Sequence, residues 1–92
     1  METKNSPKNP YRVELTFEHA IPGLGSVVSY TAKSIVGCET IARTQVLHLK
    51  QDITTTVRIF KNKSEYPCFN WTKVASYELR KSNGKLIQIL FK

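Results

Sequence analysis

The sequence predicts a small single-domain α+β fold, an antiparallel sheet of four to five strands with one helix packed on one face. Three observations predict it: stretches in which apolar and polar residues alternate, one stretch with helical spacing, and turn residues between them. The chain has 92 residues, 40% of them hydrophobic and 23% charged, which is enough for one small core. We expect a flexible polar tail over residues 1–10, where Pro7 and Pro10 block regular structure, and one domain over residues 11–92.

The first two strands are expected in the N-terminal third. Residues 11–18 alternate apolar and polar side chains with a period of two, which places four apolar side chains on one face of a strand. Residues 21–25 contain two glycines and a proline and predict a turn. A second strand is therefore expected near residues 26–35.

Residues 37–50 fit two structures. Their β-branched residues favour a strand, whereas several apolar residues recur at helical spacing. Those residues are Cys38, Ile41, Ala42, Val46 and Leu49. We predict a helix, with Gly37 at its boundary, Glu39 in the first turn and Lys50 in the last, because both charges then suit the helix dipole. The alternative is an all-β barrel or sandwich with another hairpin here.

The next strand is predicted over residues 53–60, a β-branched run that alternates again. Residues 61–64 form a polar, basic turn. Residues 65–70 are expected to form a short edge strand, since Pro67 forbids a central position.

The C-terminal hairpin turns at Ser82-Asn83-Gly84, and two registers compete. A two-residue Asn-Gly turn pairs Lys81 with Leu86 and Leu79 with Gln88, which mixes polar and apolar residues on both faces. A three-residue loop with Gly84 as a bulge gives one wholly apolar face. Its pairs are Leu79 with Ile87, Tyr77 with Ile89 and Ala75 with Phe91. We predict the bulged register.

These elements follow one another as β-β-α-β-(β)-β-β, with the helix on the apolar face of the sheet. That face is expected to hold Val13, Leu15, Phe17, Val57, Ile59, Leu79, Ile87 and Ile89. The opposite face is expected to stay open, with Arg58, Phe60, Arg80, Leu86 and Gln88 on it. The basic turns at residues 61–63 and 81–85 meet at one end of the sheet only if residues 65–70 form a strand.

The charge distribution indicates a binding surface. Residues 1–31 hold three basic and three acidic residues, whereas residues 32–92 hold eleven basic and four acidic ones, so the whole net charge of +7 lies there. Such an excess attracts polyanions or an acidic partner. The alternative is that these basic residues bind no partner and form a solvated face that keeps a small protein soluble.

Several function classes are not expected. No apolar run approaches the roughly 20 residues that cross a bilayer. The polar N-terminus does not resemble a signal peptide, so a cytoplasmic protein is expected. In the reducing cytoplasm, Cys38 and Cys68 are expected to be reduced. Neither they nor His19 and His48 show the close spacing of metal ligands. The sequence contains no motif that combines a nucleophile with a general base, and no motif with two catalytic carboxylates. We therefore expect no enzyme, no cofactor and no metal.

The first functional hypothesis is binding of nucleic acid, RNA or DNA, or of a nucleoprotein complex, by a monomer. Lysine and arginine would neutralise phosphates while aromatic rings stack on bases. The candidate binding residues are Arg58, Lys61, Lys63, Arg80, Lys81, Lys85, Phe60, Tyr66 and Trp71. The alternative is a protein-protein interaction module that docks on an acidic partner surface, with Trp71 or Tyr66 as its anchor.

The predicted β-β-α-β-β layout, the polar tail and the absence of a catalytic motif give the chain an overall resemblance to small phage and mobile-element inhibitor proteins, anti-CRISPR proteins among them. The resemblance implies a non-catalytic inhibitor in the host cytoplasm. Such an inhibitor would compete with a nucleoprotein machine, such as a CRISPR effector, by gripping its guide RNA or its DNA path.

Overall fold

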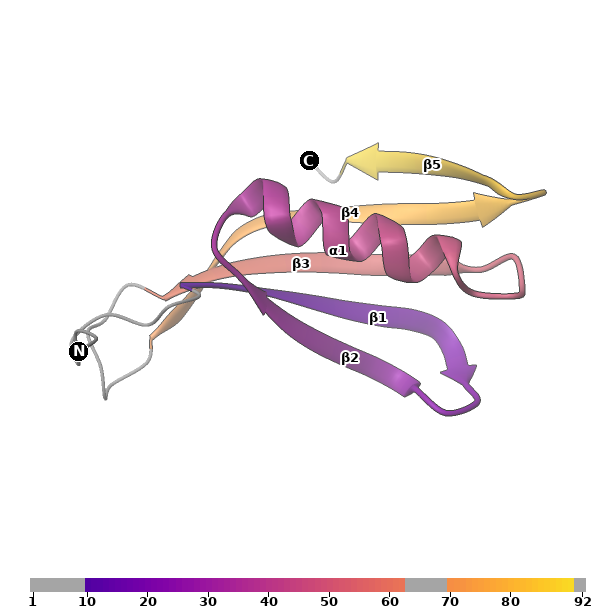
Figure 1. The fold of residues 1–92 in the computed structure, drawn as a ribbon, viewed down its shortest axis with the longest axis horizontal. Helices are drawn as coiled ribbons and strands as arrows, with labels where there is room; N and C mark the ends of the chain where they lie inside the picture. Colours follow the sequence, from indigo (N-terminus) through magenta and orange to yellow (C-terminus); the bar gives the residue numbers. More distant parts are fainter. Residues whose placement is uncertain (1–9, 63–69, 91–92) are drawn as a thin grey trace.

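Five strands and one helix make up the computed structural model, which describes residues 10–62 and 70–90 (Figure 1). The elements are β1 (Tyr11–Ile21), β2 (Gly25–Ala32), α1 (Ile35–Leu47), β3 (Thr54–Asn62), β4 (Trp71–Ser82) and β5 (Lys85–Leu90). They form a small antiparallel open sheet with one helix, a mainly β and broadly α+β fold, as the sequence predicts. The strand predicted over residues 65–70 falls almost wholly on residues 63–69, which lie outside the described residues.

The strands lie in the order β2-β1-β3-β4-β5, and every neighbouring pair is antiparallel. On β1, Val13 lies opposite Tyr30 of β2 and Ile59 of β3. Because directly opposite residues share a face of the sheet, this register gathers the predicted apolar side chains of β1 and β3 on one face.

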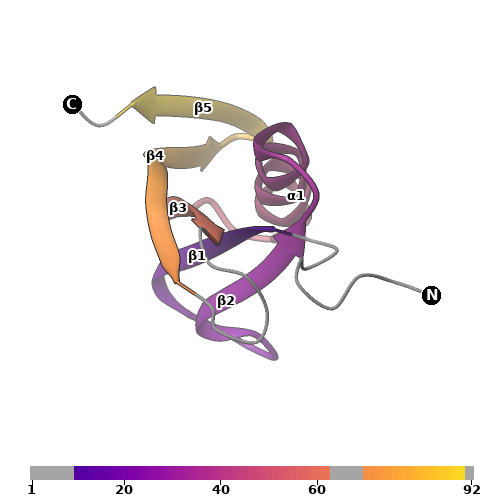
Figure 2. The ribbon, with the colours of Figure 1, turned by 90° about the vertical axis from the view of Figure 1, so that its left-hand side faces the viewer.

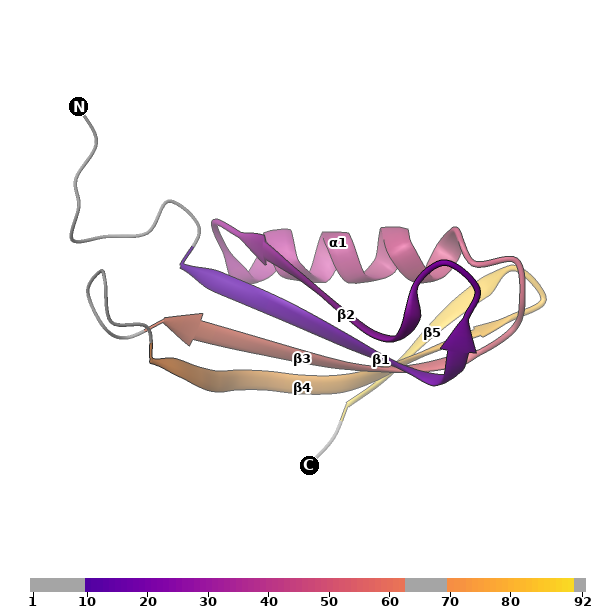
Figure 3. The ribbon, with the colours of Figure 1, turned by 90° about the horizontal axis from the view of Figure 1, so that it is seen from below.

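Helix α1 lies along that apolar face, and the sheet curls around it (Figures 2 and 3). The buried hydrophobic residues of the strands are Val13, Leu15, Phe17, Ile21, Ala32, Val57, Ile59, Tyr77 and Leu79. The helix contributes Cys38, Ala42 and Val46, with Leu49 and Ile53 following it. The apolar residues that recur at helical spacing are therefore buried, as predicted, at Cys38, Ala42 and Val46, while Ile41 is only partly buried.

The helix begins and ends earlier than the predicted residues 37–50. Ser34 is the N-cap, and its hydroxyl oxygen accepts a hydrogen bond from the Gly37 amide at 3.0 Å, so Gly37 lies inside the first turn. The predicted placement of Glu39 in the first turn and Lys50 in the last is wrong. The physical reason is that a serine cap and a lysine from β4, rather than charges on the helix itself, occupy its ends.

The predicted register of the C-terminal hairpin is wrong. The structure has the two-residue turn, in which Ser82 pairs with Lys85 and Arg80 with Ile87. Asn83 and Gly84 have φ angles of 52° and 77°, and two successive positive φ angles give a turn whose twist matches that of the strands.

This register exchanges the faces of four predicted residues. Ile87 and Ile89, expected under the helix, lie on the open face with exposed fractions of 51% and 36%. Leu86 and Gln88, expected on the open face, lie on the helix side instead: Leu86 packs against the core, and the Gln88 side chain accepts a hydrogen bond from Arg43 of α1 at 2.8 Å. The mixture of polar and apolar residues is tolerated because the polar ones bond to the helix.

Candidate nucleic-acid interface on the open sheet face

The open sheet face is the face opposite α1, and no described element covers it. Its residues follow from the strand register, since Arg12 lies opposite Phe60, and Glu14 opposite Arg58. Across β3 and β4, Phe60 lies opposite Lys73. Between Ile59 and Phe60 the pairing with β4 shifts by one residue, since Ile59 lies opposite Ala75, and Val74 is therefore an extra residue on β4.

An aromatic cluster marks one end of this face. The guanidinium carbon of Arg12 lies 5.3 Å from the ring centroid of Phe60 and 5.5 Å from that of Trp71, which are cation-π distances. Both rings are partly buried, and the Arg12 side chain keeps 34% of its surface exposed. Phe60 and Trp71 are predicted binding residues, and the structure brings them together around a shared cation.

Arg12 is one of two residues of this site that the sequence did not predict; Lys73 is the other. Arg12 lies in the first third of the chain, which has no net charge, so a count of charges by segment passes over it. Arg12 follows the alternating pattern of β1 and therefore lies on the outward face, between apolar residues that point inward. This alternation is the sequence signal that identifies it as a residue of the open face.

Two predicted basic residues of the open face are engaged in ion pairs. Arg58 lies 3.4 Å from the Glu14 carboxylate and 3.3 Å from the Thr16 hydroxyl, and Arg80 lies 3.3 Å from Glu78. Glu14 also lies 3.9 Å from Arg12. These pairs are half-exposed, with the Glu14 side chain 26% exposed, and pairs open to solvent contribute little to stability, so they can exchange for contacts with another anion at small cost.

Lys73 supplies a positive charge beside the aromatic cluster. It is exposed, lies opposite Phe60, and has no ion-pair partner within residues 10–62 and 70–90. The sequence reasoning did not select it. Together, Arg12, Phe60, Trp71 and Lys73 make up what we call the aromatic-basic cluster.

The structure separates the remaining predicted binding residues from this cluster. Lys81 lies on the helix side, where its ammonium donates hydrogen bonds to the carbonyl oxygens of Leu47, at 3.0 Å, and Leu49. Lys85 is exposed at the hairpin turn. Lys61 is exposed on the side of Tyr11, with its ammonium 5.8 Å from that ring centroid. Lys63 and Tyr66 lie outside the described residues.

The two basic turns lie at opposite ends of the sheet. β3 pairs directly with β4, so Lys61 at the end of β3 lies opposite Thr72, whereas Lys85 follows the far end of β4. The condition for a joint basic patch is therefore not met by the described strands. The candidate site is the aromatic-basic cluster with Arg58, rather than a surface made by the turns.

Two buried groups near the helix have raised pKa values. Burial, with a smaller contribution from the Glu39 carboxylate, raises the pKa of the Tyr77 hydroxyl to about 12 and also raises the pKa of the Cys38 thiol. Both groups are therefore protonated at neutral pH and are not activated as nucleophiles. No three His, Cys, Asp or Glu side chains of the described residues lie together as metal ligands.

No helix within the described ranges combines the length and the apolar character needed to span a membrane. Comparison of the chain with protein-family models, with curated proteins and with solved structures finds no match in any of the three.

Proposed function

We propose that this chain is a non-catalytic binding protein that engages single-stranded nucleic acid with its open sheet face. The observation that carries the proposal is the aromatic-basic cluster, where Phe60 and Trp71 flank Arg12 on a face that no described element covers. Proteins that bind single strands combine aromatic rings, on which bases stack, with basic groups that follow the phosphates.

The distribution of charge supports a polyanionic ligand. The net charge of the chain is +7, and Lys73 adds an exposed ammonium directly opposite Phe60. Arg12 and Arg58 share the Glu14 carboxylate, so a phosphate that replaces it meets two guanidinium groups already held in place.

A single strand fits this surface better than a duplex does. The elements that enter a duplex groove are commonly helices, and here α1 packs on the apolar face of the sheet (Figure 1). Its exposed residues include the apolar Val36 and Leu47, which offer no contact to phosphates. A sheet face with aromatic rings instead accepts splayed bases, as in other sheet-based binders of single strands.

The test is titration of labelled single-stranded RNA and DNA at several salt concentrations, followed by fluorescence anisotropy. Trp71 is the only tryptophan in the chain, so base stacking on it is also expected to quench the intrinsic fluorescence. Binding is expected to weaken with salt, because the strand releases counterions when its phosphates are neutralised. Absence of binding at low salt would overturn the proposal.

Matched variants separate a site from general attraction. Lys73→Glu reverses a charge at the cluster, and Lys50→Glu reverses an exposed charge in the loop after α1, so both change the net charge equally. We expect Lys73→Glu to weaken binding about tenfold more than Lys50→Glu does, and Phe60→Leu to weaken it with little change in salt dependence. Equal effects of the two reversals would indicate attraction by net charge alone.

A second candidate function is docking on an acidic protein surface. It is favoured by Ile87 and Ile89, which are exposed on the same face of the sheet. In that case Trp71→Leu or Ile87→Ala is expected to dominate the loss of affinity for the partner, and nucleic acid is not expected to quench Trp71. The overall resemblance implies an inhibitor of a nucleoprotein machine. Binding of nucleic acid and docking on a protein would both serve such inhibition, and we propose that the open sheet face makes the inhibitory contact.

A further inference from the structure

Strand β5 forms one edge of the sheet, because it pairs only with β4 and no described strand lies on its other side (Figure 1). It carries two exposed apolar side chains, Ile87 with an exposed fraction of 51% and Ile89 with 36%. Both lie on the open sheet face, opposite Arg80 and Glu78 of β4. An edge strand that exposes apolar side chains is a surface on which a further strand can pair.

The sequence of this edge strand reads the same in both directions. Residues 86–90 are Leu-Ile-Gln-Ile-Leu, with Gln88 at the centre. When two identical strands pair antiparallel about a two-fold axis at Gln88, each of these residues lies opposite a residue of its own type. Ile87 then lies opposite Ile89 of the second copy, so that two exposed apolar side chains meet and shield each other from water.

The backbone of β5 suits the same axis. Successive residues of an antiparallel strand direct their N–H and C=O groups alternately to one neighbour and to the other. The two-residue turn closes on Ser82 and Lys85, so residues 85, 87 and 89 bond to β4, while residues 86, 88 and 90 direct their groups to the open edge. An axis at Gln88 sets these three residues against the same three of the second copy.

We propose that the strand that pairs with β5 is β5 of a second copy of the chain, antiparallel about a two-fold axis at Gln88. Charge complementarity across the axis supports a second copy. Arg80 lies beside Ile87, and Glu78 lies beside Ile89. Each row across the joined sheet therefore runs from Arg80 through two isoleucines to Glu78 of the second copy, and its two ends carry opposite charges.

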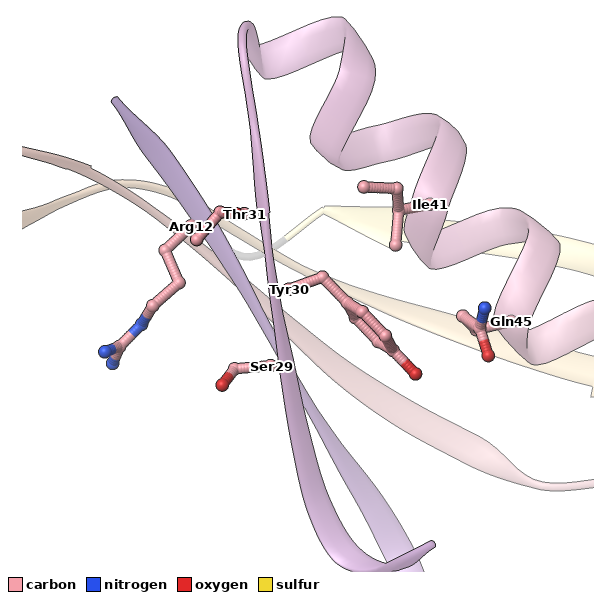
Figure 4. Close-up of a pocket in the computed structure, with 6 residues that line it drawn as sticks. All are labelled: Arg12, Ser29, Tyr30, Thr31, Ile41 and Gln45. Atoms are coloured by element: carbon pink, nitrogen blue, oxygen red, sulfur yellow. The ribbon is translucent and has the colours of Figure 1, made fainter. Parts of the chain in front are cut away.

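The other edge of the sheet is less suited to a second copy. Strand β2 reads differently in its two directions, and basic groups border it, since Lys33 follows the strand and Arg12 lines a groove beside it. The groove has a volume of about 510 Å³, with Tyr30, Ile41 and Gln45 on its helix side (Figure 4). Two copies joined there would bring like charges together without the isoleucine pairs that β5 provides.

The contact between two β5 strands is small, so a weak dimer is expected. A standard interface has about 20–30 residues a side, and the six residues of β5 with their neighbours give less than that. We expect a dissociation constant on the order of 10–100 μM. Each chain has a net charge of +7, so two copies repel each other and the dimer is expected to strengthen with salt.

The dimer does not depend on the function proposed above but would extend it. A two-fold axis perpendicular to the sheet leaves both open sheet faces on the same side, so the two aromatic-basic clusters face one ligand. Two linked clusters would bind a long strand more tightly than one cluster does, by the gain in effective concentration. The sequence alone predicts a monomer, because it does not show that β5 lies at an edge.

Sedimentation of the whole chain at rising concentration and high salt tests the dimer. We expect the mass to rise from that of one 10.5 kDa chain to that of two. A mass that stays at one chain at high micromolar concentration would overturn the proposal. Growth beyond two chains would overturn it as well, because a two-fold pairing uses the β5 edges of both copies.

Two exchanged variants test the register. Ile87→Lys and Ile89→Glu change exposed side chains, and in a dimer of either variant every remaining isoleucine of the pair lies opposite a charged residue. We expect the dissociation constant to rise about fivefold or more in each. A mixture of the two variants is expected to restore dimers, because one row then joins opposite charges and the other joins two native isoleucines. A mixture that stays monomeric would contradict an axis at Gln88.

Val27→Lys is the matched control. Val27 is β-branched, has the same exposed fraction of 51% as Ile87, and lies on the open face of the other edge strand, opposite Thr16. Its replacement is expected to leave dimerisation nearly unchanged. Loss of dimers in this variant, or dimers that ignore both isoleucine variants, would place the interface elsewhere and overturn the proposal.

Failure of the dimer is distinguishable from failure of the proposed function. The dimer is measured without nucleic acid and is expected to strengthen with salt. Single-strand binding is followed by the quenching of Trp71 and is expected to weaken with salt.

Discussion

The ammonium group of Lys81 lies 3.0 Å from the carbonyl oxygen of Leu47 and donates a hydrogen bond to it. It also bonds to the carbonyl oxygen of Leu49, so a lysine of β4 occupies the C-terminal end of α1. The last carbonyls of a helix lack partners within it and carry the negative end of its dipole. One side chain of the sheet therefore stabilises the end of the helix that packs on it.

Replacement of Lys81 by methionine is expected to lower the free energy of unfolding by about 1–2 kcal/mol, since hydrogen bonds from a charged donor are lost and carbonyls are left unpaired. Urea denaturation measures the change. Lys85→Met is the control, because Lys85 is exposed at the neighbouring turn and its loss removes the same charge. Equal effects of the two variants would show that Lys81 does not cap the helix.

The sequence allowed the fold class and most of the strands to be predicted, because a period of two is visible without tertiary information. Val13, Leu15, Val57 and Ile59 are buried as the alternation indicates. The hairpin register could not be predicted the same way. Lys81 and Gln88 looked out of place on an apolar face, and their helix partners are distant in sequence.

The candidate site was predicted only in part for a related reason. Phe60, Trp71 and Arg58 stood out as aromatic and basic residues, but Arg12 meets the two rings only because β1 lies next to β3 in the sheet. The neighbour relations of strands depend on topology. The alternation in the sequence shows which residues lie on each face of a strand, but it does not show which strands lie side by side.

The observed register makes opposite predictions for two isoleucines. Ile59 is fully buried, so Ile59→Val is expected to cost about 1 kcal/mol of unfolding free energy. Ile87 is 51% exposed, so Ile87→Val is expected to change stability by less than about 0.5 kcal/mol. Chemical denaturation of both variants decides between the registers, because the bulged register buries Ile87 and would make the two costs similar.

Tyr77 predicts a loss of stability at high pH. Its pKa is raised to about 12 in the fold, against 10.0 ordinarily, because burial disfavours the phenolate. Below pH 10 the hydroxyl is protonated in both states and the full stability is present. As the pH rises from 10 toward 12, the unfolded chain loses the proton first and is stabilised.

The contribution of Tyr77 is expected to fall by about 2 kcal/mol between pH 8 and pH 11.5, measured as the difference in unfolding free energy between the wild type and Tyr77→Phe. The Tyr77 hydroxyl has no hydrogen-bond partner among the described residues, so Tyr77→Phe is expected to fold with nearly unchanged stability at neutral pH. A difference that stays constant with pH would mean that this hydroxyl ionises normally.

Glu14 gives the sharpest test of where a polyanion binds. Its carboxylate lies 3.4 Å from Arg58 and 3.9 Å from Arg12, and a phosphate that reaches these two guanidinium groups must compete with it. Glu14→Gln removes the competing charge while keeping the shape of the side chain. Affinity for single-stranded nucleic acid is expected to rise about fivefold at low salt, with a steeper salt dependence.

Glu39→Gln is the matched control, because it makes the same change in net charge on the helix, which lies on the other side of the sheet. If both variants tighten binding equally, only the net charge matters and the open sheet face is not the interface. If Glu14→Gln alone tightens it, the phosphates lie beside Arg12 and Arg58. That result would also place the bases within reach of Phe60 and Trp71, because Arg12 already lies against both rings.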